Sequence, residues 1–193
     1  MANIGLKYMI CAPLTETTNT STYNAGQIIA RAIKADLSIE LAEANLSADD
    51  RVVESVKEFK GGKITLNCDD LSYETRALLL GHTIEDIMDG TTKIGQKLVA
   101  KADDDGAYVG VGFYATALRD GKRKYRAFWC KKVKFGTPSE SLETRGDSLN
   151  FQTPTLEGNM MADIYGIWKE EGLFNDEMEA VGWLNKQTNI VEE

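Results

Sequence analysis

The stretch that decides the fold runs from Tyr108 to Phe135. Residues 108–118 read YVGVGFYATAL, residues 119–122 read RDGK, and residues 123–135 read RKYRAFWCKKVKF. Both halves are rich in aromatic and β-branched residues, which favour strands. Asp120-Gly121 supplies the positive φ angles that a two-residue type I′ turn requires. The pattern predicts a long β-hairpin.

The length of the turn decides which side chains of this hairpin share a face. A two-residue loop pairs Arg119 with Lys122, sets Phe113 opposite Phe128 and lays Trp129 over the bare backbone of Gly112. A three-residue loop instead sets Phe113 opposite Trp129. In either register one face is apolar from Val109 to Ala117. Three lysines of the returning strand must then reach solvent, an acidic partner or a subunit edge: Lys131, Lys132 and Lys134.

Composition limits the classes of protein that fit. A chain of 193 residues with 42% hydrophobic and 27% charged residues is typical of one globular domain. The net charge of −8 argues against binding nucleic acid by neutralising phosphates. Cys11, Cys68 and Cys130 are an odd number of widely spaced thiols, so we expect them to be reduced. We expect no signal peptide and no membrane span, and synthesis in a reducing cytoplasm.

The rest of the chain predicts strands and few helices. Residues 1–25 are polar, and we expect a flexible N-terminal arm, or one that folds only against a partner. From Asp36 the sequence alternates strictly, which predicts a half-buried strand with an acidic outer face. Within a meander over 36–68, residues 44–60 are expected to form a long loop: a polar turn over 44–50, followed by a strand or extended arm over 51–60 with Val53 and Phe59 as anchors. Residues 82–105 show no clear period.

Two helices complete the prediction. Residues 69–81 begin with acids and end at Gly81, the signature of a short helix. Asn175 opens an amphipathic helix whose inner face would be Met178, Val181 and Leu184. A last strand is expected within 160–168. The fold class is therefore mainly β: a single domain, over 1–193, closed as a sandwich or barrel of antiparallel strands with one or two flanking helices.

The candidate motifs for cofactor binding, catalysis and metal binding each lack a feature that the function requires. Gly110-Val-Gly112 lies inside a strand, whereas a dinucleotide site needs its glycines at a helix N-terminus. His82 follows a helix stop with no nucleophile nearby in sequence, and Asp103-Asp104-Asp105 lacks calcium-loop spacing. We therefore expect no catalytic residue, no cofactor and no metal site.

The motifs, in their order and spacing, resemble the major tail proteins, or tail-tube proteins, of long-tailed non-contractile bacteriophages (siphoviruses), particularly those that infect Gram-positive hosts. The likeness spans most of the chain. The matching segments are IGLKY at 4–8, LSADD at 46–50 with Glu54, GGKIT at 61–65, DDL at 69–71 with the helix to Gly81, YVGVGF at 108–113, YRAFW at 125–129 with 131–135, and TPTLEG at 153–158.

The resemblance implies a structural virion protein. Its subunits would close into hexameric rings, and the rings would stack into a hollow tube around the tape-measure protein. Further partners would be the tail-tip or baseplate proteins and the tail terminator, with genomic DNA only in transit and no membrane. The location would be the virion tail, assembled in the host cytoplasm, with no enzymatic activity.

Candidate contact residues are our own inference from charge. Asp36 and Glu40 are candidates for the lumen, where acidic groups repel phosphate, and the alternative is that they only face solvent. Lys131, Lys132 and Lys134 are candidates for contacts between subunits or rings, with Asp49, Asp50 and Glu54 as partners. Two other functions stay open: the tube of a domesticated tail-like particle or secretion system, and a monomeric β-sandwich that binds ligands or mediates adhesion.

Overall fold

The computed structural model describes residues 2–48, 51–119, 121–140 and 153–190, and within them the protein is mainly β with antiparallel strands and two helices. The elements are β1 Ala2–Glu16, β2 Ser21–Tyr23, β3 Gln27–Ala30, β4 Ala32–Ala48, β5 Arg51–Cys68, α1 Tyr73–Leu80, β6 Thr83–Asp89, β7 Thr92–Val99, β8 Val109–Arg119, β9 Lys122–Phe135, β10 Thr155–Met161, β11 Lys169–Phe174 and α2 Glu177–Thr188.

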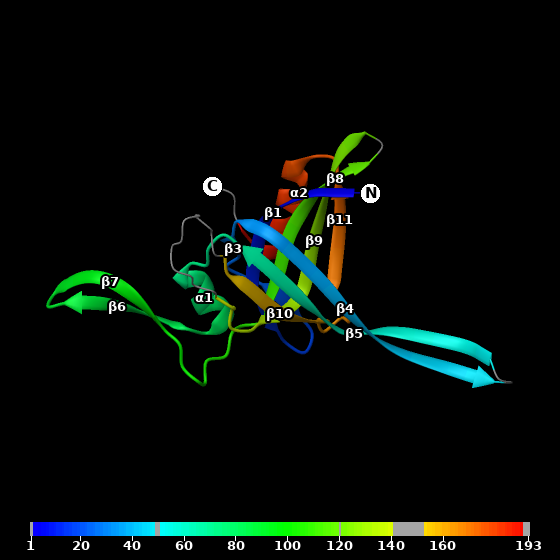
Figure 1. Ribbon diagram of the computed structural model, residues 1–193, viewed down its shortest axis with the longest axis horizontal. Helices are drawn as coiled ribbons and strands as arrows, with labels where there is room; N and C mark the ends of the chain where they lie inside the picture. Colours follow the sequence, from blue (N-terminus) through cyan, green and yellow to red (C-terminus); the bar gives the residue numbers. More distant parts are fainter. Residues whose placement is uncertain (1, 49–50, 120, 141–152, 191–193) are drawn as a thin grey trace, which may run out of the picture.

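The predicted hairpin is strands β8 and β9, which lie at the centre of the molecule (Figure 1). Arg119 pairs with Lys122, so the loop has two residues, and Phe113 lies opposite Phe128. Trp129 lies opposite Gly112, as the two-residue register predicts. Gly121 has a φ of 73°, the positive value that this turn requires.

The main sheet folds into two layers because β9 changes its partner. The first half of β9 pairs with β11, from Tyr125 to Cys130, and its last residues pair with β10, from Lys132 to Phe135. The sheet order is β2-β1-β8-β9-β10-β5-β4. Strands β4, β5 and β10 thereby cross in front of β1, β8 and β9 (Figure 1). The space between the layers holds the larger apolar core, which includes Cys11, Leu66, Val111 and Phe128.

Helix α2 covers the other face of β1, β8 and β9 (Figure 1). Its Leu184 and Ala180 are fully buried against Trp129 and Ile10. The helix begins at the cap Asp176, whose carboxylate accepts a hydrogen bond from the Met178 amide, and ends at Asn189 in the left-handed conformation. The inner face is Ala180, Leu184 and Thr188, so the expectation that Met178 points inward is wrong.

The expectation of a flexible arm over 1–25 is also wrong. Strand β1 pairs with β8 in the middle of the sheet, and Met9, Ile10, Cys11 and Ala12 are fully buried. Met9 and Cys11 face one core while Ile10 and Ala12 face the other. A strand covered on both faces has a continuous apolar run and no alternation of apolar and polar residues. The short run from Met9 to Ala12 therefore gave no strand signal, and the polar residues after it led to the prediction of an arm.

Residues 44–60 are not a long loop. Strands β4 and β5 stay paired from Ala32 opposite Cys68 out to Ala48 opposite Arg51, so the expected meander is one long hairpin. Asp49 and Asp50, between the two strands, lie outside the described residues. The outer part of this hairpin projects far beyond the sandwich (Figure 1).

The remaining elements are helix α1, the β6–β7 hairpin and the last two strands. Helix α1 confirms the helix prediction: Ser72 caps it and Gly81 ends it with a φ of 78°. Residues 83–99, expected to be irregular, form the separate hairpin β6–β7. The last strands are Thr155–Met161 and Lys169–Phe174, and residues 162–168, where one strand was expected, form the turn between them.

Candidate functional site: the projecting arms and the polar sheet face

The largest uncovered feature is the outer half of the β4–β5 hairpin, residues 41–58, which we call the β4–β5 arm. Every residue of the arm whose burial is described is exposed, including four large apolar ones. Leu41, Leu46, Val53 and Val56 have exposed fractions of 56%, 60%, 62% and 48%. An isolated two-stranded hairpin is only marginally stable in water, so such an arm gains from a covering partner.

The two faces of the arm differ in chemistry. Residues paired across an antiparallel ladder point to the same side, and the sides alternate along the strand. On one face, Leu41 opposite Phe59 lies at the root, and Glu43 opposite Lys57 and Asn45 opposite Ser55 make the part beyond it polar. Glu43 and Lys57 form an ion pair of 3.3 Å. The second face combines apolar side chains with two carboxylates that have no ion pair to a described residue: Ala42, Ala44, Leu46 and Val56 with Glu54 and Glu58.

A ring stack holds the root of the arm. Phe59 of β5 lies parallel to Trp168, with centroids 4.8 Å apart and an interplanar angle of 4°. Trp168 belongs to the turn that precedes β11, so the stack joins the arm to the sandwich. The stack is thus a contact that anchors the root of the arm to the body.

The second projection is the β6–β7 hairpin, which leaves the body on the opposite side (Figure 1). Two ion pairs cross its strands, Glu85 with Lys97 at 2.8 Å and Asp86 with Lys93 at 2.7 Å. Its outer residues Ile87, Met88 and Ile94 are exposed by 39%, 53% and 63%. This hairpin is a second surface that its own chain leaves uncovered.

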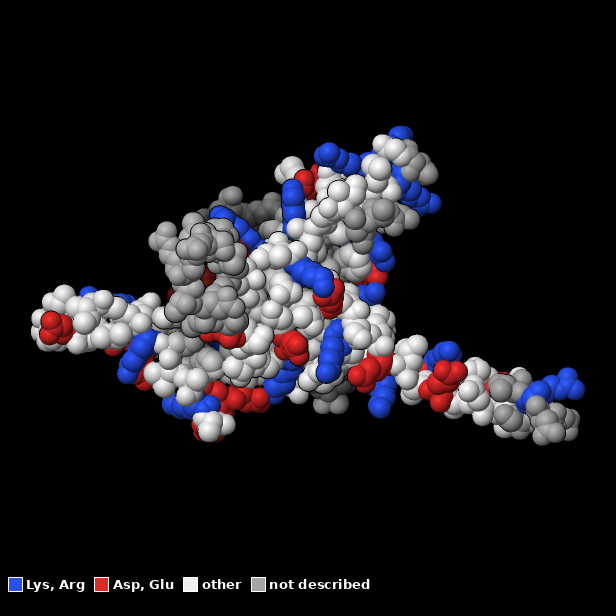
Figure 2. Space-filling model, in the orientation of Figure 1, with Lys and Arg blue, Asp and Glu red and all other residues white. Residues whose placement is uncertain are grey.

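Asp36 and Glu40 lie where the sequence predicted, on the outer face of β4, and both are exposed. The surrounding face is not acidic as a whole. Lys34 forms an ion pair of 2.5 Å with Asp36, and Lys63 lies opposite Ser38 on the neighbouring strand. Figure 2 shows blue and red side chains alternating over β4, β5 and β10. We call this surface the polar sheet face.

The three lysines of β9 have acidic partners within their own chain. Lys131 pairs with Glu170 at 2.8 Å, Lys134 pairs with Asp105 at 2.5 Å, and Lys132 pairs with Glu16. Glu16 also accepts a hydrogen bond of 3.2 Å from the Ile164 amide. Each of these charges therefore has a partner in its own chain, and a contact of these lysines with Glu54 of another subunit stays a prediction. Asp49 and Asp50 lie outside the described residues.

The residues weighed as cofactor, catalytic or metal sites lie in separate parts of the fold. Gly110 and Gly112 lie in the first half of β8, next to the Trp129 ring. Burial raises the pKa of the Cys11 and Cys130 thiols to about 12 and that of Cys68 to about 11, which keeps them protonated. The Asp104 carboxylate accepts a hydrogen bond from the Lys101 amide, as in an ordinary turn. The described residues hold no group of three or more potential metal ligands, and neither described helix has the length and apolarity to cross a membrane.

Comparison with known proteins identifies no relative: no family model matches the chain, and no curated protein matches it. The surfaces themselves therefore carry the functional argument. One signal in the sequence could have revealed the second arm, since Asp89-Gly90 is a hairpin turn signal of the same kind as Asp120-Gly121.

Proposed function

We propose that the protein is the tube subunit of a long, non-contractile phage tail, which polymerises as stacked hexameric rings and forms the conduit for genome delivery. The observation that carries the proposal is the uncovered β4–β5 arm. A rigidly anchored hairpin with exposed apolar side chains on a well-packed sandwich serves an assembly better than a monomer.

The polar sheet face fits a conduit. A surface of alternating charges, with Asp36, Glu40 and Glu157 interspersed among lysines, presents no continuous basic track for phosphates. The net charge of −8 adds long-range repulsion of DNA. We place this face on the lumen, where DNA must pass without being held. The tape-measure protein would fill the lumen beforehand, and tail-tip and terminator proteins would close the ends.

The experiment is negative-stain electron microscopy of the purified protein over a concentration series, paired with sedimentation velocity. We expect rings or hollow tubes above a threshold concentration, or on addition of a tail-tip complex as a nucleus. A protein that remains monomeric under both conditions would refute the proposal. A tube of a domesticated tail-like particle would give the same images, and it is separated from a virion by whether the particles contain DNA-filled heads.

The monomeric ligand-binding alternative needs an exposed aromatic platform, and the aromatic residues of the central hairpin do not provide one. Trp129 is fully buried and Phe113 and Phe128 are exposed by only 4% and 8%. The proposal of a tube subunit accounts for both projecting arms, which a monomeric binding module would leave unexplained.

A further inference from the structure

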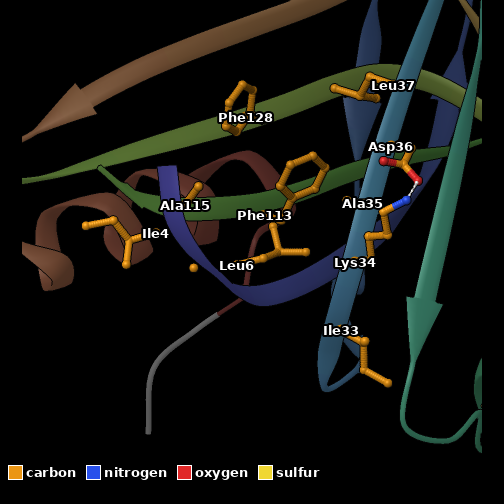
Figure 3. Close-up of a pocket in the computed structure, with 11 residues that line it drawn as sticks. Ile4, Leu6, Ile33, Lys34, Ala35, Asp36, Leu37, Phe113, Ala115 and Phe128 are labelled. Carbon is orange, nitrogen blue, oxygen red and sulfur yellow. Dashed lines mark ion pairs between the residues drawn. The ribbon is translucent and has the colours of Figure 1, made fainter. Parts of the chain in front are cut away.

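A groove of about 660 Å³ opens between strands β1 and β4 (Figure 3). Its floor is formed by Phe113, Ala115 and Phe128, which belong to the inner face of β8 and β9. Leu6 of β1 and Leu37 of β4 stand at its sides, and Ile4 and Ile33 are exposed at its rim by 64% and 54%. The Lys34–Asp36 ion pair of β4 also lines the groove, so an apolar floor lies beside a charged edge, and solvent reaches both in the single chain.

The floor of the groove continues onto a basic surface. Along the β8–β9 ladder, Phe113 and Phe128 are followed on the same face by Ala115 with Arg126, Ala117 with Lys124 and Arg119 with Lys122. Arg126 lies over the Phe128 ring at 4.8 Å and pairs with Glu171. Basic side chains, blue in Figure 2, gather at the tip of the β8–β9 hairpin at the top of the view.

Two of these cations carry uncompensated charge. Within the described part of the chain, no ion pair joins Lys122 or Lys124 to a carboxylate, and Lys124 donates only to the neutral side chain of Asn175. The surface thus passes from apolar to basic over about 20 Å, the rise of the six steps from Phe113 to Arg119, and among the described residues Lys122 and Lys124 have no ion pair on it.

The apolar and acidic face of the β4–β5 arm has the complementary chemistry. It carries Ala44, Leu46 and Val56 beside Glu54 and Glu58, and it extends for about 13 Å from Ala42 to Leu46. Its carboxylates, like the two lysines, have no ion pair among the described residues. The carboxylates are opposite in charge to the two lysines, and both surfaces also carry apolar side chains.

The arm cannot reach the groove of its own chain. Ile33 to Leu37 of β4 line the groove, and the same strand continues away from it into the arm, which Figure 1 shows pointing out from the body. The contact must therefore be heterologous: one copy gives its arm to a second copy, whose own arm goes to a third. Such a contact propagates by itself into a ring or a filament.

We propose that the β1–β4 groove of one subunit receives the apolar and acidic face of the β4–β5 arm of a second copy, with Glu54 and Glu58 beside Lys122 and Lys124. The inference rests on the proposed function and names the surface that each arm uses. It replaces Lys131, Lys132 and Lys134 as the partners of Glu54.

The test uses two charge-reversed variants of the whole chain, Glu54→Lys/Glu58→Lys and Lys122→Glu/Lys124→Glu. Each alone sets like charges against each other at every contact, and we expect its threshold concentration for assembly to rise roughly tenfold or more. In an equal mixture, the reversed arm of the first fits the reversed groove of the second, and the native arm of the second fits the native groove of the first. The mixture should assemble near the native threshold, as alternating copies.

Matched controls lie on the opposite faces of the same hairpins. Asn45→Lys is compared with Glu54→Lys, and Arg123→Glu with Lys122→Glu, and we expect both controls to assemble as the native protein does. Circular dichroism checks that every variant is folded. Assembly of the double variants at the native threshold, or a folded mixture that fails to assemble, would overturn the groove assignment while native tubes leave the proposed function standing. A native protein that never self-associates would overturn both.

Discussion

Replacing Gly112 with alanine tests the central packing of the sandwich. An ideal Cβ at this position lies 2.9 Å from Trp129 Cε3 and 2.9 Å from Leu184 Cδ2, both far inside van der Waals contact. Neither neighbour can retreat easily, because both side chains are fully buried. Overpacking a dense core costs about 1–3 kcal/mol, partly offset by up to about 1 kcal/mol from the lower chain entropy of alanine in the unfolded state. We expect a net loss of about 1–2 kcal/mol.

The assay is urea unfolding of the monomer followed by tryptophan fluorescence. With a urea m-value of about 2 kcal/mol/M, the midpoint should fall by about 0.5–1 M. Gly5→Ala is the matched strand control, because nothing lies within 4 Å of the added Cβ there, and its midpoint should stay or rise slightly. Adding Leu184→Ala to Gly112→Ala should cost less than the sum of the two single changes. Equal midpoints for Gly112→Ala and Gly5→Ala would refute the packing of Trp129 and α2 over this strand.

Three further predictions concern thiols, pH and proteolysis. At pH 8 the native protein should react with a thiol reagent no faster than it unfolds, since burial raises the pKa of Cys11 and Cys130 to about 12, and denaturant should release all three thiols. Hydrogen bonds from Tyr114 and Lys7 lower the pKa of Glu177, so the carboxylate stabilises the fold above pH 4.5 and this contribution is lost as the pH falls further. The stability gap between the native protein and Glu177→Gln, measured by thermal unfolding, should therefore be present at pH 7 and close below pH 4.5, and a gap constant with pH would contradict the assignment. Trypsin should cut monomers in both projecting hairpins, at Lys57 and Lys97 among others, and cut tubes there more slowly, whereas equal rates would count against covered arms.

The sequence predicted the elements whose signals are local. Asp120-Gly121 and the aromatic strands around it determined the central hairpin and its register, and the cap and the final glycine determined α1. Sequence alternation also placed Asp36 and Glu40 correctly on an outer face. In each case the physical cause acts within a few residues of the signal.

The errors come from contacts between distant segments. Strand β1 was missed because Met9 to Ala12 are covered on both faces, by elements that follow much later in the chain. The ion pair of Lys132 was also not foreseen, because its partner Glu16 lies 116 positions away. The arm over 44–60 was read as a loop because neither of its faces is buried, so no alternation of burial marks its strands. A hairpin that its own chain leaves uncovered on both faces can therefore have the composition of a loop.

The bulge at the base of the arm connects the fold to the proposed assembly. The register of β4 and β5 shifts between Glu40, opposite Gly61, and Leu41, opposite Phe59, so Lys60 is the extra residue. Such a bulge bends a hairpin and increases its twist. A Cβ at Gly62 would lie 2.7 Å from the Ser38 carbonyl oxygen and 2.8 Å from Met160 Cε, so glycine is what allows the strands to approach at this bend. Residues on one side of the bend line the groove, and residues on the other side form the arm. In a heterologous contact, the angle between the donated and the receiving surface sets the rotation from each copy to the next. In the proposed assembly, the bend at Glu40, next to the Phe59–Trp168 stack, would therefore set whether the contacts close into a ring.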